Sequence, residues 1–143
     1  MKKIFRYLLG DLKKSFKLEK RSFYRKEFHK SVVFIVISRH EDDKSSKQQE
    51  GTALDLSIRG MCFLVNHLRY DGLHVWKDDS FLDPNYLKIA FMLPGYKNPI
   101  EVLAEVVSFS LAGPRYIKQY KLGVKFTDIK SDAREAIKRY MEK

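Results

Sequence analysis

The sequence has few of the features that mark secreted, membrane-spanning or disulfide-bonded proteins. Its one cysteine, Cys62, excludes an internal disulfide and fits a reducing compartment. No apolar run approaches the roughly 20 residues that a membrane-spanning helix needs. The N-terminus is basic, but charges at Asp11, Lys13 and Lys14 interrupt any signal-peptide core. A cytoplasmic location is therefore the default expectation.

Patterns typical of metal sites and catalysis are also missing. The histidines are scattered, and none pairs with cysteine or acidic residues at metal-ligand spacing. We find no Ser/His/Asp arrangement, no paired carboxylates and no glycine-rich phosphate loop. The sequence therefore predicts no resident metal or cofactor and no enzymatic activity. Cys62 lies between Met61 and Phe63, which predicts a buried, inert thiol.

What the chain does have is enough apolar material for one folded domain, and an uneven distribution of charge. It has 143 residues, of which 44% are hydrophobic and 13% aromatic. The net charge is +10, and residues 1–30, with eleven basic and three acidic side chains, carry +8 of it. A basic N-terminal arm on a nearly neutral domain predicts an anionic partner, or alternatively a tail that only aids solubility.

Residues 2–18 predict an amphipathic helix, because apolar residues recur there at steps of three and four with basic residues between them. Gly10 weakens this helix by about 1 kcal/mol relative to alanine. We expect residues 1–18 to form an N-terminal helix that precedes a single domain over residues 19–143, which includes a basic arm at 19–30. The apolar positions of the helix are Ile4, Phe5, Leu8, Leu9, Leu12 and Phe16.

From residue 31 onward the apolar residues follow a period of two, which is typical of β-strands. In the second strand we expect Leu54, Leu56 and Ile58 on one face and Asp55 and Ser57 on the other. Six short strands without intervening helices predict a mainly β fold, an antiparallel barrel or sandwich. The expected strands are 31–39, 52–58, 61–65, 86–93, 100–110 and 120–127.

Two further segments flank these strands. Residues 66–85 form a long connection, which we expect either to be packed by its own aromatic residues or to be functionally mobile. The chain ends in a predicted helix with Ser131 as N-cap. Its expected buried stripe consists of Ala133, Ile137, Tyr140 and Met141.

Two short motifs carry most of the functional information. Asp55 and Ser57 are two residues apart on a strand, so a carboxylate there can accept hydrogen bonds from the N1–H and N2–H₂ edge of guanine, with a hydroxyl beside it. Gly60 lacks the Cβ that would obstruct a ligand. The alternative is that Asp55 and Ser57 only stabilise a hairpin turn.

The second motif lies in the basic arm. Arg21 and Arg25 carry planar guanidinium groups, which fit both the O6/N7 edge of guanine and phosphate oxygens. Phe23 and Tyr24 are expected to pack and anchor the arm. A solvated basic patch is the alternative interpretation of these arginines.

In this order, Arg21-x-x-x-Arg25 followed by Asp55-x-Ser57-x-x-Gly60 resembles the signature of the PilZ domain. PilZ domains are bacterial receptors for the second messenger cyclic di-GMP. The resemblance implies that the two arginines clamp guanine edges and phosphates. It also implies that the aspartate and serine bind a guanine while the glycine keeps the floor of the site open.

The resemblance covers roughly residues 19–143. Residues 122–126 look like the last strand of the family, followed by its terminal helix, so the implied fold is a six-stranded antiparallel PilZ-like barrel. Many members have arginine at the position of Lys20. Lysine keeps the charge but loses the planar fork, so one ligand molecule and an intercalated pair both stay open.

These observations lead to the hypothesis of a cyclic di-GMP-binding effector. Residues 17–30 would be mobile without the ligand, and the ligand would fold them onto the barrel. This movement would carry the 2–18 helix to or from a protein partner and control an output of the motility or exopolysaccharide type. Self-association through the helix stays open.

Two alternatives do not need the nucleotide. A nucleic-acid-binding barrel would explain the charge, but the barrel itself is nearly neutral and lacks a stripe of basic and aromatic residues. We therefore do not expect a nucleic-acid partner. An adaptor that docks its 2–18 helix on a protein or on a membrane is the other alternative, with the membrane less favoured.

Overall fold

The computed structural model describes residues 25–41, 43–76, 85–114 and 118–142. The predicted helix at 2–18, and with it the division at residue 18, lies outside these residues. So do Lys20 and Arg21 of the first motif.

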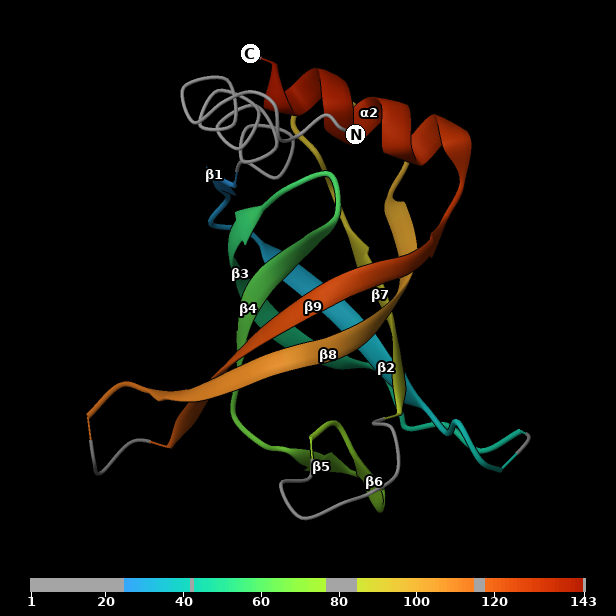
Figure 1. Cartoon of the computed structure of the whole chain (residues 1–143), viewed down its shortest axis with the longest axis vertical. Coiled ribbons are helices and arrows are strands. Elements are labelled where there is room, and N and C mark those ends of the chain that lie inside the picture. The colour runs from blue at the N-terminus through green and yellow to red at the C-terminus, as the bar shows by residue number, and fades with distance from the viewer. Residues whose placement is uncertain (1–24, 42, 77–84, 115–117, 143) are drawn as a thin grey trace, which may run out of the picture.

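Six antiparallel strands close into a barrel (Figure 1). They are hydrogen-bonded in the order β3-β2-β7-β8-β9-β4, and the pairing of β3 with β4 completes the ring. The predicted mainly β, six-stranded antiparallel barrel is confirmed. Closure satisfies the edge strands that an open sheet would expose. The strands are β2 (Ser31–Ile37), β3 (Gln49–Leu56), β4 (Gly60–Val65), β7 (Tyr86–Phe91), β8 (Ile100–Ala112) and β9 (Gln119–Ile129).

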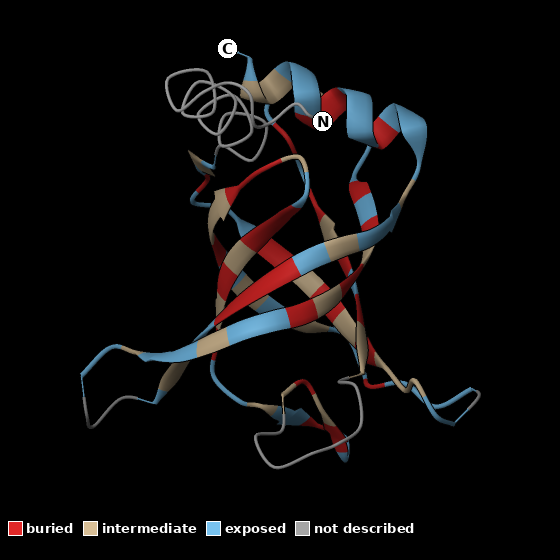
Figure 2. Cartoon of the chain, viewed as in Figure 1, coloured by how far each residue is buried: buried red, intermediate tan, exposed pale blue. Residues whose placement is uncertain are grey.

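Alternation along the strands builds the core of the barrel. In β2, for example, Val32, Phe34 and Val36 are buried while the residues between them are more exposed. Figure 2 shows buried positions alternating with others around the barrel. Each fully buried aliphatic or aromatic side chain contributes about 1.5–3 kcal/mol through removal of apolar surface from water.

A bulge interrupts β3 just before the second motif. The register against β4 shifts between Ala53 and Asp55, so Ala53 and Leu56 are buried and Leu54 is only partly buried. The expectation that Leu54 and Leu56 share the inward face is therefore wrong. A bulge places an extra residue in one strand and re-aims the side chains that follow it. In this protein it fixes the direction of Asp55.

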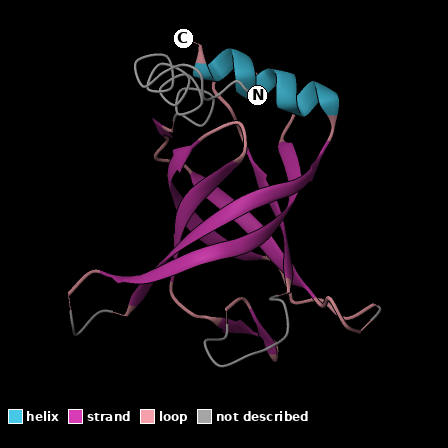
Figure 3. Cartoon of the chain, viewed as in Figure 1, coloured by secondary structure: helices cyan, strands magenta, loops and turns pink. Residues whose placement is uncertain are grey.

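The helix α2 (Ser131–Met141) lies across one end of the barrel (Figure 3). Its N-cap residue is Lys130 rather than the predicted Ser131, and the side chain of Lys130 makes no capping hydrogen bond. Within the described part of the chain, no helix has the length and apolar character needed to cross a membrane. The buried residues are Ala133, Ala136 and Ile137, while the predicted Tyr140 and Met141 are partly buried against the core.

The other end of the barrel is covered by a short hairpin, β5 (Arg69–Tyr70) and β6 (Leu73–His74) (Figure 1). Tyr70 is buried there and packs edge-on against Phe34, with ring centroids 5.4 Å apart. The described part of the 66–85 connection is thus packed by its own aromatic and apolar residues.

The first described residues belong to the barrel. The strand β1 (Lys26–Glu27) pairs with the end of β3. Phe28, only 2% exposed, packs edge-on against Phe91 and Tyr140, with ring centroids 5.6 and 5.7 Å apart. Mobility of all of residues 17–30 stays a prediction, but at residues 26–30 it carries a cost because their release would expose a core phenylalanine.

Candidate functional site

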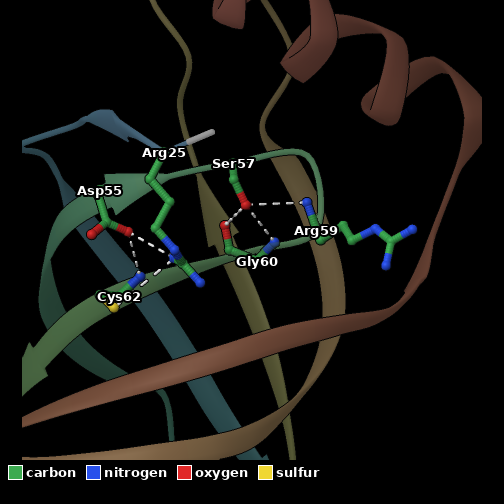
Figure 4. Close-up of polar contacts among 6 residues, drawn as sticks. All are labelled: Arg25, Asp55, Ser57, Arg59, Gly60 and Cys62. Carbon is green, nitrogen blue, oxygen red and sulfur yellow. Dashed lines mark hydrogen bonds and ion pairs between the residues drawn. The ribbon is translucent and has the colours of Figure 1, made fainter. Parts of the chain in front are cut away.

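The two motifs meet at an ion pair on the outside of the barrel (Figure 4). Nη1 of Arg25 lies 2.9 Å from Oδ1 of Asp55, although the residues are 30 positions apart. The contact follows from the pairing of β1 with β3, which places Glu27 opposite Asp55. The two side chains are 44% and 25% exposed, and a pair this accessible contributes about 1 kcal/mol or less. It can therefore open at small cost.

The protein backbone fixes the carboxylate of Asp55. Oδ1 also accepts a hydrogen bond from the backbone N–H of Cys62, at 3.1 Å. The contacts from Arg25 and from the Cys62 N–H both go to Oδ1. The Cys62 thiol also shares a hydrogen bond with this carboxylate. The barrel thus holds Oδ1 in place, and Oδ2 can accept from a donor that comes from outside.

Cys62 lies beside this ion pair rather than in the core. Its Sγ is 4.0 Å from Nη1 of Arg25, and its side chain is partly exposed. The expectation of a buried thiol is wrong, because Met61 and Phe63 occupy the inward positions of β4. Partial burial and then the negative charge of Asp55 raise the pKa of the Cys62 thiol. The thiol is therefore a neutral neighbour of the site near pH 7.

Ser57 holds the turn between β3 and β4. It is 2% exposed. Its Oγ accepts hydrogen bonds from the N–H groups of Arg59 (3.3 Å) and Gly60 (3.2 Å), and donates to the carbonyl of Gly60 (3.2 Å). A hydroxyl has one proton and two lone pairs, so its capacity is used. The hairpin alternative thus describes the contacts of Ser57 and the Asp55 contact with the Cys62 N–H, but not the ion pair of Asp55 with Arg25. A direct contact of Ser57 with a ligand stays a prediction.

Gly60 is needed by the barrel itself. A Cβ at this position would lie 2.0 Å from the carbonyl oxygen of Val124 in β9. The missing side chain therefore lets β4 and β9 approach each other. This close approach explains the glycine without a ligand, whereas the sequence predicted that the glycine keeps the floor of a ligand site open. The contact of Gly60 with a ligand stays a prediction.

Beside the motif turn lies a cavity of about 470 Å³ that the sequence did not indicate. Arg59 points toward it, away from Arg25 and Asp55 (Figure 4). Arg59 lies within the second motif, although it is not one of the positions that define the motif. No local sequence pattern indicates that Arg134 of α2 lines the same cavity. The lining residues are Ile58, Arg59, Lys125, Phe126, Thr127, Ile129 and Arg134.

A metal centre is not part of this arrangement. Among residues 25–41, 43–76, 85–114 and 118–142, no group of three or more histidine, cysteine or acidic side chains is placed to hold an ion.

Comparison with known proteins gives a family match over most of the chain. The model of the PilZ domain family matches residues 19–143. The chain belongs to the PilZ family. The match assigns the barrel, the motif turn and α2 to one PilZ domain. No curated protein sequence matches the chain.

Solved structures share the fold of this PilZ domain at low sequence identity. The Bacillus subtilis inhibitor of motility MotI (DgrA) has a TM-score of 0.57 and 18% identity, over 84% of this chain and 48% of MotI. MrkH of K. pneumonia in its apo state has a TM-score of 0.52 and 14% identity, over 83% of this chain and 48% of MrkH. The chain thus spans about half the length of these two proteins.

The PilZ domain of Escherichia coli YcgR, solved with c-di-GMP, has a TM-score of 0.50 and 13% identity. The match covers 84% of this chain and 87% of the YcgR domain. At these identities the likeness is one of fold.

Proposed function

We propose that this PilZ domain binds cyclic di-GMP and acts as a signalling effector without catalytic activity. The observation that carries the proposal is the contact of Arg25 with Asp55, which joins the two motifs on an accessible face of the barrel. The proposal is also supported by the family match and by the similar YcgR domain, which was solved with this ligand.

The geometry of Asp55 suggests how a guanine enters. The N1–H and N2–H₂ groups of the base require two carboxylate oxygens, and Oδ1 already accepts from Arg25 and from Cys62 N–H. The guanine therefore displaces Arg25 from Asp55. The released guanidinium then binds a phosphate or the O6/N7 edge of a guanine, so one charged contact replaces another.

Two further cations of the arm complete the proposed clamp. Arg21 supplies a second planar fork, and Lys20 supplies charge without a fork. Cyclic di-GMP carries two negative charges, which suits an N-terminal segment with a net charge of +8.

The anchored position of Phe28 sets the limit of the proposed switch. Residues 26–30 stay on the barrel, so the ligand acts on residues 17–25 and, through them, on the helix predicted at 2–18. That helix would contact a protein partner. We expect saturating cyclic di-GMP to slow hydrogen exchange in residues 17–25 by roughly tenfold or more and to leave residues 26–30 unchanged. Equal exchange of residues 17–25 with and without ligand would contradict the switch.

Calorimetric titration with cyclic di-GMP tests the binding itself. We expect a dissociation constant in the micromolar range or tighter, about −8 kcal/mol or better. Arg25→Ala removes the displaced guanidinium and should weaken binding by about 2 kcal/mol, roughly thirtyfold.

The matched control is Arg69→Ala, because Arg69 is an exposed arginine of β5 at the opposite end of the barrel. This variant loses the same charge and should bind within about twofold of the unmodified protein. Absence of heat with the unmodified protein would refute cyclic di-GMP binding, and equal losses in both variants would assign the effect of Arg25 to net charge alone.

A further inference from the structure

Three cations converge on the cavity beside the motif turn, one from each of three elements. Arg59 comes from the turn between β3 and β4, Lys125 from β9 and Arg134 from α2. All three side chains are exposed. No acidic residue of the described chain lines the cavity.

Such a convergence favours an anion. The fold places the ammonium group of Lys125 and the guanidinium group of Arg134 beside about 470 Å³ of solvent-accessible space, and a negative group between these two is attracted to both. The acidic residues of the same elements, Asp128, Asp132 and Glu135, do not line the cavity. Their carboxylates therefore do not lie among the cations inside the cavity.

The cavity also offers apolar surface. Ile58, Phe126 and Ile129 line it, and all three are partly buried against the core. A cavity with an apolar wall and a rim of guanidinium and ammonium groups suits a ligand that joins a planar base to a phosphate. A free inorganic anion would leave that wall unused.

The cavity continues the face that carries Asp55. Along β4, Cys62 lies opposite Asp55 and Gly60 lies opposite Lys125. Gly60 and Cys62 are two residues apart, about 7 Å along a strand, and their positions face the same side. One elongated ligand can therefore touch Asp55 at one end and Lys125 at the other.

We propose that this cavity binds the second nucleotide of cyclic di-GMP, with Lys125 and Arg134 on its phosphate and Arg59 at the rim. The inference rests on the proposed function and extends it, because it adds a residue of the terminal helix to the ligand site. The same helix meets the N-terminal segment, where Nζ of Lys26 donates to the carbonyl of Tyr140 at 3.2 Å. The bound ligand is thus in contact with α2 and with the arm at once.

The test compares charge-matched variants by titration with cyclic di-GMP. Arg134→Gln and Lys125→Gln each remove one cation from the cavity and should raise the dissociation constant about tenfold. Arg139→Gln, in the last turn of α2, and Lys88→Gln, exposed on β7, remove the same charge elsewhere. These controls should stay within about twofold. Bound ligand should also slow amide exchange in the first turns of α2, and Arg134→Gln should abolish that protection.

The outcomes separate this inference from the function on which it rests. If the unmodified protein binds and Arg25→Ala weakens binding, but Arg134→Gln and Lys125→Gln match their controls, the cavity is not part of the site and the inference is overturned. If the unmodified protein gives no heat, cyclic di-GMP binding and the inference fall together. Equal losses in cavity variants and controls would likewise overturn the inference, since net charge alone would explain them.

Discussion

Replacing Gly60 with alanine is expected to destabilise the barrel by about 3 kcal/mol or more, a large share of the roughly 5–15 kcal/mol typical of a domain. The new Cβ would lie 2.0 Å from the carbonyl oxygen of Val124, which is backbone and cannot rotate away. The pairing of Gly60 with Lys125 must then open, and the motif turn moves with it. Urea unfolding should show a lower midpoint with an unchanged slope.

Gly72→Ala is the matched control for this prediction. Gly72 has a φ of +84°, and no heavy atom lies within 4 Å of the point that a Cβ would occupy. Its replacement should cost only about 1 kcal/mol, through backbone strain without any collision. If Gly60→Ala costs no more than Gly72→Ala, β9 moves aside easily and the close approach does not explain the glycine.

Replacing Phe28 with alanine is expected to cost about 3–5 kcal/mol of unfolding free energy. Phe28 is 2% exposed and packs edge-on against Phe91 and Tyr140, so its truncation leaves a cavity between the barrel and α2. Chemical unfolding monitored by circular dichroism measures the loss. The exposed Leu111, 74% accessible, provides the control, since Leu111→Ala should change stability by less than about 0.5 kcal/mol.

This second prediction also locates the hinge of the proposed switch. A loss under about 1 kcal/mol would mean that residues 26–30 are not anchored, and the moving segment would then extend to residue 30. A loss in the expected range confines the movement to residues before Lys26.

Much of the barrel could be predicted from the sequence because its signals are local. Alternation of apolar residues marked the six barrel strands, which differ from the expected ranges only at their ends, whereas the two-residue strands β1, β5 and β6 were not expected. The helix α2 was expected from its own pattern of apolar and charged residues, although its cap was misplaced. Strand ends are harder to predict because turn geometry and pairing partners, rather than periodicity, decide where hydrogen bonding stops.

The sequence predicted only part of the candidate site. The motifs singled out Arg25 and Asp55, and the structure brings these two into contact. The sequence left open whether Ser57 uses its hydroxyl on the turn or on a ligand, and it did not show that Cys62 faces outward beside the ion pair. Both depend on strand register, and the bulge in β3 that sets this register arises from pairing with β4.

By itself, the sequence determined the strands, the basic arm and the residue types available for a nucleotide, because each depends on a few neighbouring positions. Only the tertiary structure decided that Phe28 anchors the start of the domain, that Gly60 admits β9, and that Arg134 meets Lys125 at one cavity. These are contacts between residues far apart in the chain. Barrel closure fixes them through the combined register of several strands, which no local pattern encodes.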